Sequence, residues 1–152
     1  MKKAAFAVVG VRNFAAEHIK QLRLLAQEGL GELKAVVITD LEKNKTQAQE
    51  LAAQGVTIYN SYSELLEKGK GTIDIITLPT AIHTHYQMAL DGMRAGYNLI
   101  LEKPPAPTVQ QMDTLIKVEK ETGVFCSIGF QQIHAQTIQR LKQMIVAGDF
   151  GE

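Results

Sequence analysis

The sequence has no excess of charge of either sign. Its 152 residues include 16 basic and 16 acidic side chains, which gives a formal net charge of zero at pH 7. No stretch gathers the basic residues into a patch of the kind through which nucleic acids and anionic membrane surfaces are bound. Tryptophan, which is suited to stacking on single-stranded bases, is missing. We therefore expect neither a nucleic acid nor a membrane as a partner.

Cysteine and long apolar runs are scarce as well. The one cysteine, Cys126, cannot form an internal disulfide, which fits the reducing cytoplasm. It lies in the apolar stretch "VFCSIGF", where we expect a small packed side chain rather than a reactive thiol. No apolar run reaches the roughly 18 residues of a membrane span. The opening "MKKAAFAVVG" predicts a first strand rather than a signal peptide.

Short apolar segments alternate with longer amphipathic ones along the chain. Six short segments are rich in Val, Ile and Phe and mostly lack a clean apolar–polar alternation, which is typical of strands buried on both faces of a parallel sheet. The pattern predicts an α/β fold: a Rossmann-type, doubly wound, mainly parallel sheet with helices on both faces, in three layers. The expected strands lie within 4–10, 33–40, 56–60, 73–79, 98–104 and 124–130.

Several helix ends are marked by polar residues and glycines. Ser61 stands three residues before Glu64, and Thr108 stands three residues before Gln111, which predicts a capping box at the start of two helices. A last helical segment is predicted within "AQTIQRLKQMIVAGDFGE", residues 135–152. Glycines mark the expected ends of three other helices, at Gly55, Gly96 and Gly123.

The turn between the first strand and the first helix, within "VVGVRNFAAEH", has the outline of a dinucleotide-binding fingerprint. Gly10 occupies the place of the first glycine, which allows the tight turn. Ala15 occupies the place of the third, where alanine is an accepted variant. Arg12 replaces the second glycine, at the closest approach to the pyrophosphate. Two interpretations stay open: Arg12 pairs with a phosphate, or it fills the site.

Asp40 ends the second predicted strand. A carboxylate there accepts hydrogen bonds from the adenosine ribose hydroxyls and repels a 2′-phosphate, which favours NAD over NADP. Lys43 and Lys45 follow closely and keep NADP open. The alternative is that Asp40 only caps the helix expected to begin near Leu41.

Three stretches resemble the glucose-fructose oxidoreductase, inositol dehydrogenase and rhizopine-catabolism family. They are "IDIITLPTAIHTHYQMALDGMRAG", "NLILEKPPAPTVQQM" and "GVFCSIGFQQ". The Glu-Lys-Pro at 102–104 is the most specific element, and the pair of Pro79 and His83 is the second. Members of that family are two-domain, nicotinamide-dependent oxidoreductases of sugars and polyols. The resemblance covers nearly the whole chain.

The resemblance implies a role for each matching position. The turn would hold the pyrophosphate, and Asp40 the adenosine ribose. Lys103 would be the catalytic residue, because a lysine in a closed pocket beside a positive nicotinamide ring can orient the substrate hydroxyl and share its proton. The full set implied for cofactor binding is Gly10, Arg12, Asn13, Phe14, Ala15, Asp40, Leu78, Pro79, Thr80, His83, Glu102 and Lys103.

The sequence departs from the family pattern in three ways. Thr80 stands where Asn is common, and Gln132-Ile133 stands where an Arg is common. The family's C-terminal domain, with most substrate contacts and the usual oligomer interface, is not in the sequence. Residues 1–152 are thus expected to form an NAD(P)-binding domain that is inactive alone. A non-catalytic dinucleotide sensor or scaffold is the alternative.

The histidines do not indicate a further site. His83 and His85 are two residues apart, whereas a helical zinc pair prefers a spacing of four, so no metal is expected. His18 shares the apolar face of the first helix and is interpreted as a core or edge residue.

Overall fold

The computed structural model describes residues 3–151, and its centre is one sheet of six parallel strands. The strands are β1 (Ala4–Val9), β2 (Gly31–Val37), β3 (Thr57–Tyr59), β4 (Ile75–Leu78), β5 (Asn98–Leu101) and β6 (Cys126–Ile128). The helices are α1 (Phe14–Gln27), α2 (Lys45–Ala53), α3 (Tyr62–Lys68), α4 (Ile82–Arg94), α5 (Val109–Thr122), the 3₁₀ helix η1 (Gln131–His134) and α6 (Gln136–Ala147).

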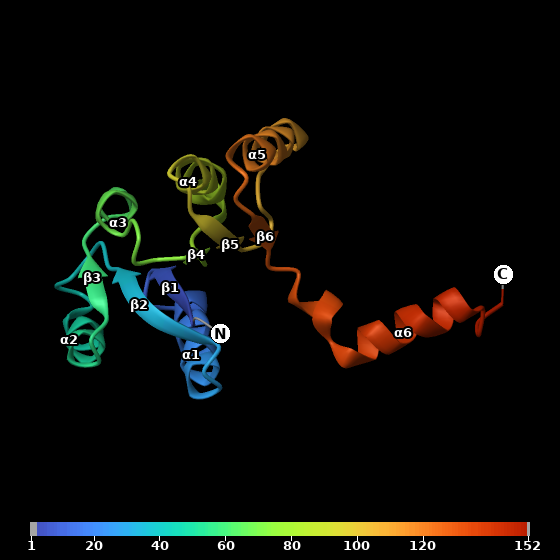
Figure 1. Ribbon diagram of the computed structural model, residues 1–152, viewed down its shortest axis with the longest axis horizontal. Helices are drawn as coiled ribbons and strands as arrows, with labels where there is room; N and C mark the ends of the chain where they lie inside the picture. Colours follow the sequence, from blue (N-terminus) through green and yellow to red (C-terminus); the bar gives the residue numbers. More distant parts are fainter. Residues whose placement is uncertain (1–2, 152) are drawn as a thin grey trace.

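The strands run in the order β3-β2-β1-β4-β5-β6 across the sheet. The chain therefore starts in the middle, winds outward to β3, returns past β1 to β4, and winds outward again to β6 (Figure 1). This is the doubly wound order, and its reversal between β1 and β4 opens a crevice at the carboxyl ends of these strands. The predicted Rossmann-type fold is confirmed.

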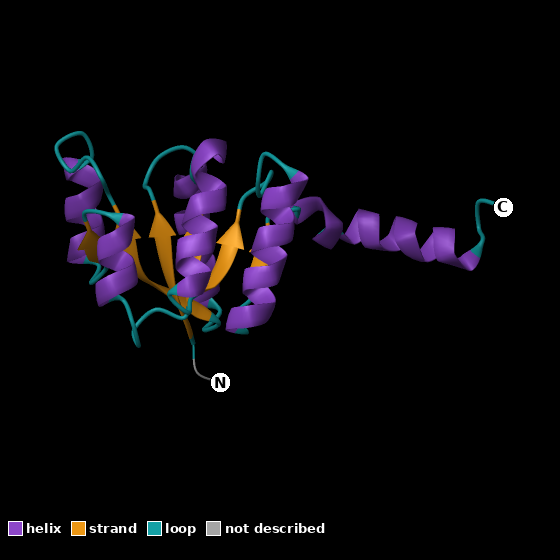
Figure 2. Ribbon diagram, turned by 90° about the horizontal axis from the view of Figure 1, so that it is seen from above, coloured by secondary structure: helices purple, strands orange, loops and turns teal. Residues whose placement is uncertain are grey.

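The core has one layer of apolar contacts on each face of the sheet. Successive side chains of a strand point to opposite faces, so Phe6 and Val8 of β1 pack in one cluster and Ala7 and Val9 in the other. The first cluster is covered by α1 and α2, and the second by α3, α4 and α5 (Figure 1). Seen from above in Figure 2, the helices stand alongside the strands. The three layers predicted from the sequence are present.

All six predicted strands are found, but β2 begins two residues earlier than expected. Its first residue, Gly31, pairs with Ala4 of β1. A Cβ at Gly31 would lie 2.8 Å from Phe6 Cε2, so this glycine lets the strand pass closely over a core ring. The segment 31–32 is not apolar, and periodicity therefore gave no signal for it.

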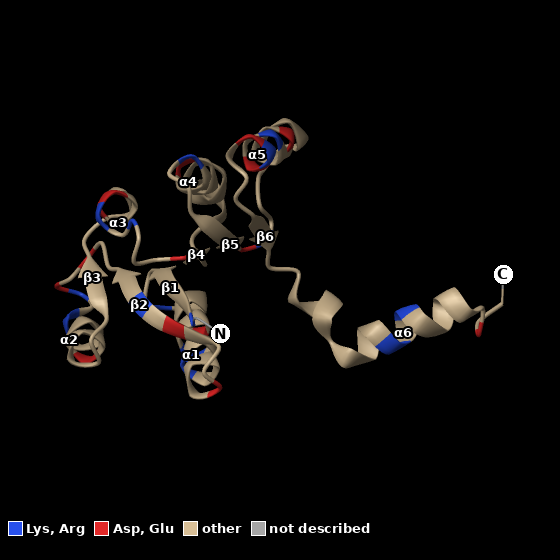
Figure 3. Cartoon of the chain, viewed as in Figure 1, with Lys and Arg blue, Asp and Glu red and all other residues tan. Residues whose placement is uncertain are grey.

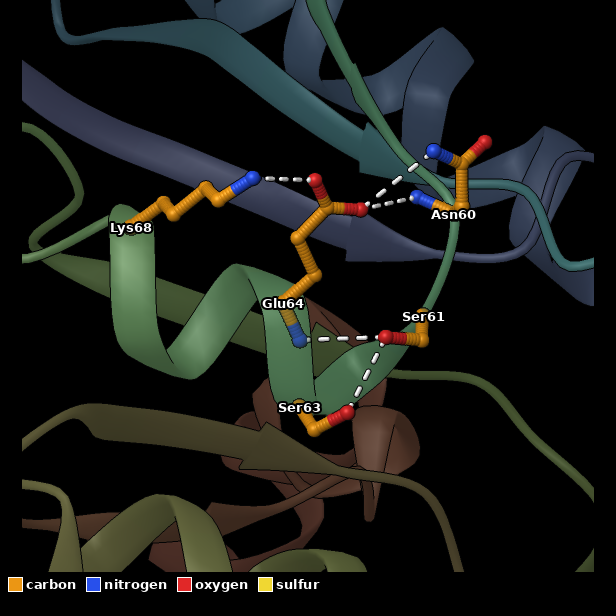
Figure 4. A network of polar contacts seen from close by, with 5 residues as sticks. All are labelled: Asn60, Ser61, Ser63, Glu64 and Lys68. Atoms are coloured by element: carbon orange, nitrogen blue, oxygen red, sulfur yellow. Dashed lines mark hydrogen bonds and ion pairs between the residues drawn. The ribbon is translucent and has the colours of Figure 1, made fainter.

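Both predicted capping residues do cap their helices. Ser61 Oγ accepts the Glu64 backbone N–H at 3.1 Å, and Thr108 Oγ1 accepts that of Gln111 at 3.3 Å. In a regular capping box the Glu64 carboxylate would accept the backbone N–H of Ser61. Here Glu64 Oε2 instead accepts the backbone N–H of Asn60, at 2.8 Å. Figure 4 shows this network, with Lys68 on the other carboxylate oxygen of Glu64.

The last helix, α6, extends away from the sheet and its covering helices (Figures 1 and 2). The predicted helical segment 135–152 is shorter than expected, since it ends at Ala147 and Gly148 follows in the left-handed region. Nearly all side chains of α6 are exposed, including Ile138, Leu141 and Ile145. Its only charged residues are basic, as Figure 3 shows. No helix within residues 3–151 is long and apolar enough to cross a membrane.

Removing the cap of α3 should destabilise the fold by a small, measurable amount. We expect Ser61→Ala to lower the free energy of unfolding by about 1 kcal/mol, because the Glu64 N–H loses its acceptor. In a domain of this size that corresponds to a melting temperature roughly 2–4 °C lower. Ser63→Ala is the control, since it keeps the Ser61 cap. An equal loss in both variants would contradict the assignment.

The thiol of Cys126 should react slowly in the folded chain. Burial, with a smaller contribution from the Glu119 carboxylate, raises its pKa to about 12. At pH 8 the thiolate fraction is then roughly a thousandfold smaller than for an ordinary thiol. A thiol-specific chromogenic disulfide at pH 8 should thus react slowly with native protein and rapidly in denaturant. Glu119→Gln should change the native rate much less than denaturation does. Free-thiol reactivity in the native state would refute this.

Candidate functional site

The loops that carry the predicted site residues leave the sheet at one edge. Gly10 follows β1, Asp40 lies beyond β2, Pro79 follows β4 and Lys103 lies just beyond β5. Since these strands are parallel, all four loops lie at their carboxyl ends. Two neighbouring cavities open there, which we name the turn cavity and the lysine cavity.

The turn cavity has a volume of about 370 Å³ and lies at the reversal between β1 and β4. Its walls come from the β1–α1 turn, from the end of β2 with the following loop, and from the β4–α4 loop. Its lining includes Gly10, Arg12, Ala15, Asn44, Pro79 and Thr80.

The β1–α1 turn keeps the backbone of a phosphate-binding turn. Gly10 has a φ of 101°, which favours glycine, and a Cβ there would lie 3.3 Å from the Cβ of Ala15. Ala15 is itself buried, so alanine fits where the third glycine of the fingerprint stands. Asn13 precedes α1 with a φ of 52° and gives the helix no side-chain cap. The turn thus leaves the positive end of the α1 dipole facing the cavity edge.

Arg12 reaches across to the loop after β2. Its exposed guanidinium donates a hydrogen bond to the backbone carbonyl of Lys43. The same guanidinium contributes, as a smaller effect, to a lowered pKa of Asp40. The side chain that replaces the second glycine is therefore tied to the backbone of the loop after β2.

Asp40 is held in its ionised form by Lys43. Asp40 Oδ1 accepts the Lys43 backbone N–H at 3.1 Å, and Oδ2 lies 3.0 Å from Lys43 Nζ. These contacts with Lys43 hold the pKa of the carboxyl below its usual value. Asp40 caps the turn of 41–44 rather than α2, whose N-cap is Asn44. Asp40 is not among the lining residues of either cavity.

Asn44 lines the turn cavity and was not predicted. Its side chain is buried, and its Nδ2 donates to the carbonyl of Asp40 at 2.6 Å. Its Oδ1 has no hydrogen-bond partner among the described residues. A buried acceptor without a donor is costly, and this oxygen is enclosed by protein. The sequence offered only the general preference of Asn for helix starts.

The lysine cavity is larger, about 560 Å³, and adjoins the turn cavity. Pro79 and Thr80 line both of them and form the shared wall. The Lys103 side chain lines this cavity, and its ammonium makes no hydrogen bond or ion pair within residues 3–151. The other lining residues are Phe14, Ile82, His85, Glu102 and the segment 129–133.

Glu102 is a buried carboxylate at the inner end of the lysine cavity. Its Oε1 lies 3.2 Å from His18 Nε2 and accepts a hydrogen bond from Gln131 Nε2 at 3.4 Å. Gly129 lies close beside it: a Cβ there would lie 2.6 Å from the same oxygen, so a larger residue would require the carboxylate to move. His18, interpreted from the sequence as a core or edge residue, is thus the partner of a site residue. The ring of Phe14 packs against it edge to face.

Four predicted residues line neither cavity: Asn13, Asp40, Leu78 and His83. Leu78 is fully buried at the end of β4, and its carbonyl accepts the Glu102 N–H at 3.4 Å. His83 is exposed on α4 and lines neither cavity, whereas His85, two residues later, is buried and lines the lysine cavity. Within residues 3–151, no three His, Cys, Asp or Glu side chains gather closely enough to hold a metal ion.

Known proteins are similar to this chain in sequence and in fold. Residues 4–130 match the family described as an oxidoreductase family with an NAD-binding Rossmann fold. The sequence is 27% identical over 148 residues to the scyllo-inositol 2-dehydrogenase (NAD(+)) of Bacillus subtilis, covering 96% of this chain and 41% of that protein. It is 27% identical over 145 residues to the 4-carboxy-2-hydroxymuconate-6-semialdehyde dehydrogenase of Sphingobium sp., covering 94% of this chain and 43% of that one.

The structural comparison agrees with the sequence. The WlbA dehydrogenase from Bordetella pertussis, crystallised in complex with NADH and UDP-GlcNAcA, is similar with a TM-score of 0.84 and 28% identity. The similarity covers 99% of this chain and 42% of that one. The chain spans 35% to 43% of the length of the curated relatives it matches. On the evidence of its sequence and fold, this chain belongs to the oxidoreductase family with an NAD-binding Rossmann fold.

Proposed function

We propose that residues 1–152 are the nucleotide-binding domain of an oxidoreductase that removes hydride from a hydroxyl-bearing carbon of a sugar or polyol. The observation that carries the proposal is the junction of the two cavities at Pro79 and Thr80. One cavity ends at a phosphate-binding turn, and the other is lined by a lysine without a partner. A dinucleotide laid across that junction has its phosphates at the turn and its nicotinamide toward Lys103.

The residues of the turn cavity fit a dinucleotide. Gly10 and Ala15 keep the backbone of the turn open, and the N-terminus of α1 favours a negative charge there. Asp40 lies in the loop after β2, outside the lining of this cavity, and its contacts with Lys43 hold the pKa of its carboxyl below the usual value. Its carboxylate accepts ribose hydroxyls and opposes a 2′-phosphate, which supports NAD rather than NADP.

Lys103 is the residue to which we assign the chemistry at the substrate. Bound NAD supplies the hydride acceptor. The alcohol must also lose a proton, and Lys103 is placed to hold the hydroxyl oxygen and to take part in that transfer. Glu102 is unsuited to this task because it is buried and engaged by His18 and Gln131. It instead fixes the backbone from which Lys103 projects.

The substrate class rests on relatives. One is a scyllo-inositol 2-dehydrogenase, and another binds a UDP-linked sugar acid in its crystal structure. We assign most substrate contacts to a second domain of the whole protein, because this chain spans less than half of those proteins. A single cysteine, which cannot form an internal disulfide, suits a protein of the cytoplasm, the compartment we propose.

Replacing Asp40 should remove the preference for NADH. We expect the chain to bind NADH with a dissociation constant in the high micromolar range, roughly −5 to −6 kcal/mol. Asp40→Ala should weaken NADH binding about tenfold and leave NADPH binding unchanged or stronger, since the ribose acceptor and the repulsion of a 2′-phosphate are both lost. Calorimetric titration with both nucleotides measures this. Glu42→Ala, on the same exposed loop, is the matched control; an equal loss for both nucleotides would contradict the assignment.

Replacing Arg12 decides between the two interpretations of the altered fingerprint. We expect the guanidinium to exchange its contact with the Lys43 carbonyl for a phosphate oxygen. Arg12→Gly should then bind NADH less tightly and with a weaker dependence on salt. Tighter binding would mean instead that the side chain obstructs the site. Arg23→Ala, on α1, removes a positive charge outside the cavities and serves as the control. If no variant binds at millimolar NADH, the proposed function is wrong.

A further inference from the structure

His85 is a buried residue of the lysine cavity. It lies in the first turn of α4, is 1% exposed, and lines the lysine cavity. Both of its ring nitrogens face backbone carbonyl oxygens. Nδ1 lies 2.8 Å from the oxygen of Pro104, and Nε2 lies 3.0 Å from the oxygen of Thr80.

Two carbonyl partners are more than a neutral imidazole can satisfy. The neutral ring has one N–H donor, and its other nitrogen is an acceptor. A carbonyl oxygen only accepts, so the neutral ring would make one hydrogen bond and set a lone pair against the second oxygen at hydrogen-bond distance. Turning the ring over would place carbon atoms near both oxygens and satisfy neither. Only the imidazolium, with a proton on each nitrogen, donates to both.

The two carbonyls belong to the two loops that matter for the proposed reaction. Thr80 is in the β4–α4 loop and forms the wall shared by the cavities. Pro104 follows Lys103 directly in the β5–α5 loop. A ring bound to both oxygens fixes the distance between these loops. The ring itself belongs to α4, the helix that follows the β4–α4 loop.

We infer that His85 is a doubly protonated clamp that joins the β4–α4 and β5–α5 loops and thereby positions Lys103 against the nicotinamide end of the cofactor site. The clamp itself rests on the hydrogen-bond geometry alone. Its effect on the cofactor rests on the proposed function. His85 is a positioning residue in this scheme, since it acts through the backbone of its neighbours.

The surroundings of His85 are compatible with a positive charge. The other ionisable side chains that line the lysine cavity are Glu102 and Lys103. The buried carboxylate of Glu102 favours an imidazolium and the exposed ammonium of Lys103 opposes it. Strands β4 and β5, which pack against α4, have no charged residue within their bounds, and no charged side chain of α5 lines the cavity. A buried cation needs its hydrogen bonds, and both are present.

Nuclear magnetic resonance of the nitrogen-15-labelled chain tests the protonation state directly. Through-bond correlations assign the ring of His85 among the four histidines. We expect both of its nitrogens to carry protons at pH 7, each with the shift of a protonated nitrogen. A single protonated nitrogen at that pH would overturn the clamp. This measurement uses the unaltered protein and does not depend on whether a variant folds.

Nucleotide titration tests the positioning role. His85→Gln should bind NADH about tenfold more weakly, and His134→Gln, which changes an exposed histidine outside both cavities, should bind as the unaltered chain does. In the unaltered chain, NADH affinity should fall as the pH rises through the loss of the second His85 proton seen in the spectra, and His85→Gln should lack this dependence. Unchanged affinity in His85→Gln would overturn the positioning role.

The two proposals fail in different ways. If the unaltered chain does not bind NADH at all, the proposed function is wrong, while the spectra still decide the protonation state of His85. If His85→Gln is too unstable to titrate, the pH dependence of NADH affinity in the unaltered chain decides the positioning role. A flat profile across the loss of the second His85 proton would then overturn it.

Discussion

The site depends on one geometric constraint, the common direction of the six strands. Every strand ends at the same edge, so each loop that follows a strand there contributes to one face of the molecule. Val8 of β1 is in register with both Val36 of β2 and Thr77 of β4. The turn at Gly10 and the loop at Pro79 therefore leave the sheet at nearly the same level, and the crevice between them follows from the winding order alone.

A second constraint lies beneath Lys103. The neighbouring residues of the Glu-Lys-Pro segment have opposite surroundings: Glu102 is buried against His18 of α1, and Lys103 faces the cavity. The pairing links a helix at the start of the chain to the loop after β5, and Gly129 beyond β6 leaves the space that the carboxylate occupies. Three distant segments thus fix one carboxylate, and this anchors the backbone that presents the lysine.

Sequence patterns predicted the fold well and the site partly. Buried strands and helix caps are local signals, so all six strands and the Ser61 and Thr108 caps were found. Partners were not predictable, because periodicity reports that His18 is turned inward but not that it meets Glu102. His85 did carry a signal: with Ala89 and Met93 it forms a spacing of four along α4, and all three are buried. The family pattern, by contrast, points to His83, which is exposed.

The wall between the two cavities explains how the site tolerates unusual residues. Thr80 stands where the resemblance leads one to expect Asn. Its polar contacts are with residues of the following helix, α4. Its carbonyl faces His85 Nε2, and its hydroxyl accepts a hydrogen bond from Thr84. These contacts hold the wall by its backbone and by one short hydroxyl contact. The same reasoning applies to the turn, where Gly10 sets the backbone and Arg12 extends outward to the Lys43 carbonyl. In both places the path of the main chain preserves the cavity, and side-chain identity is left free to adjust what binds there.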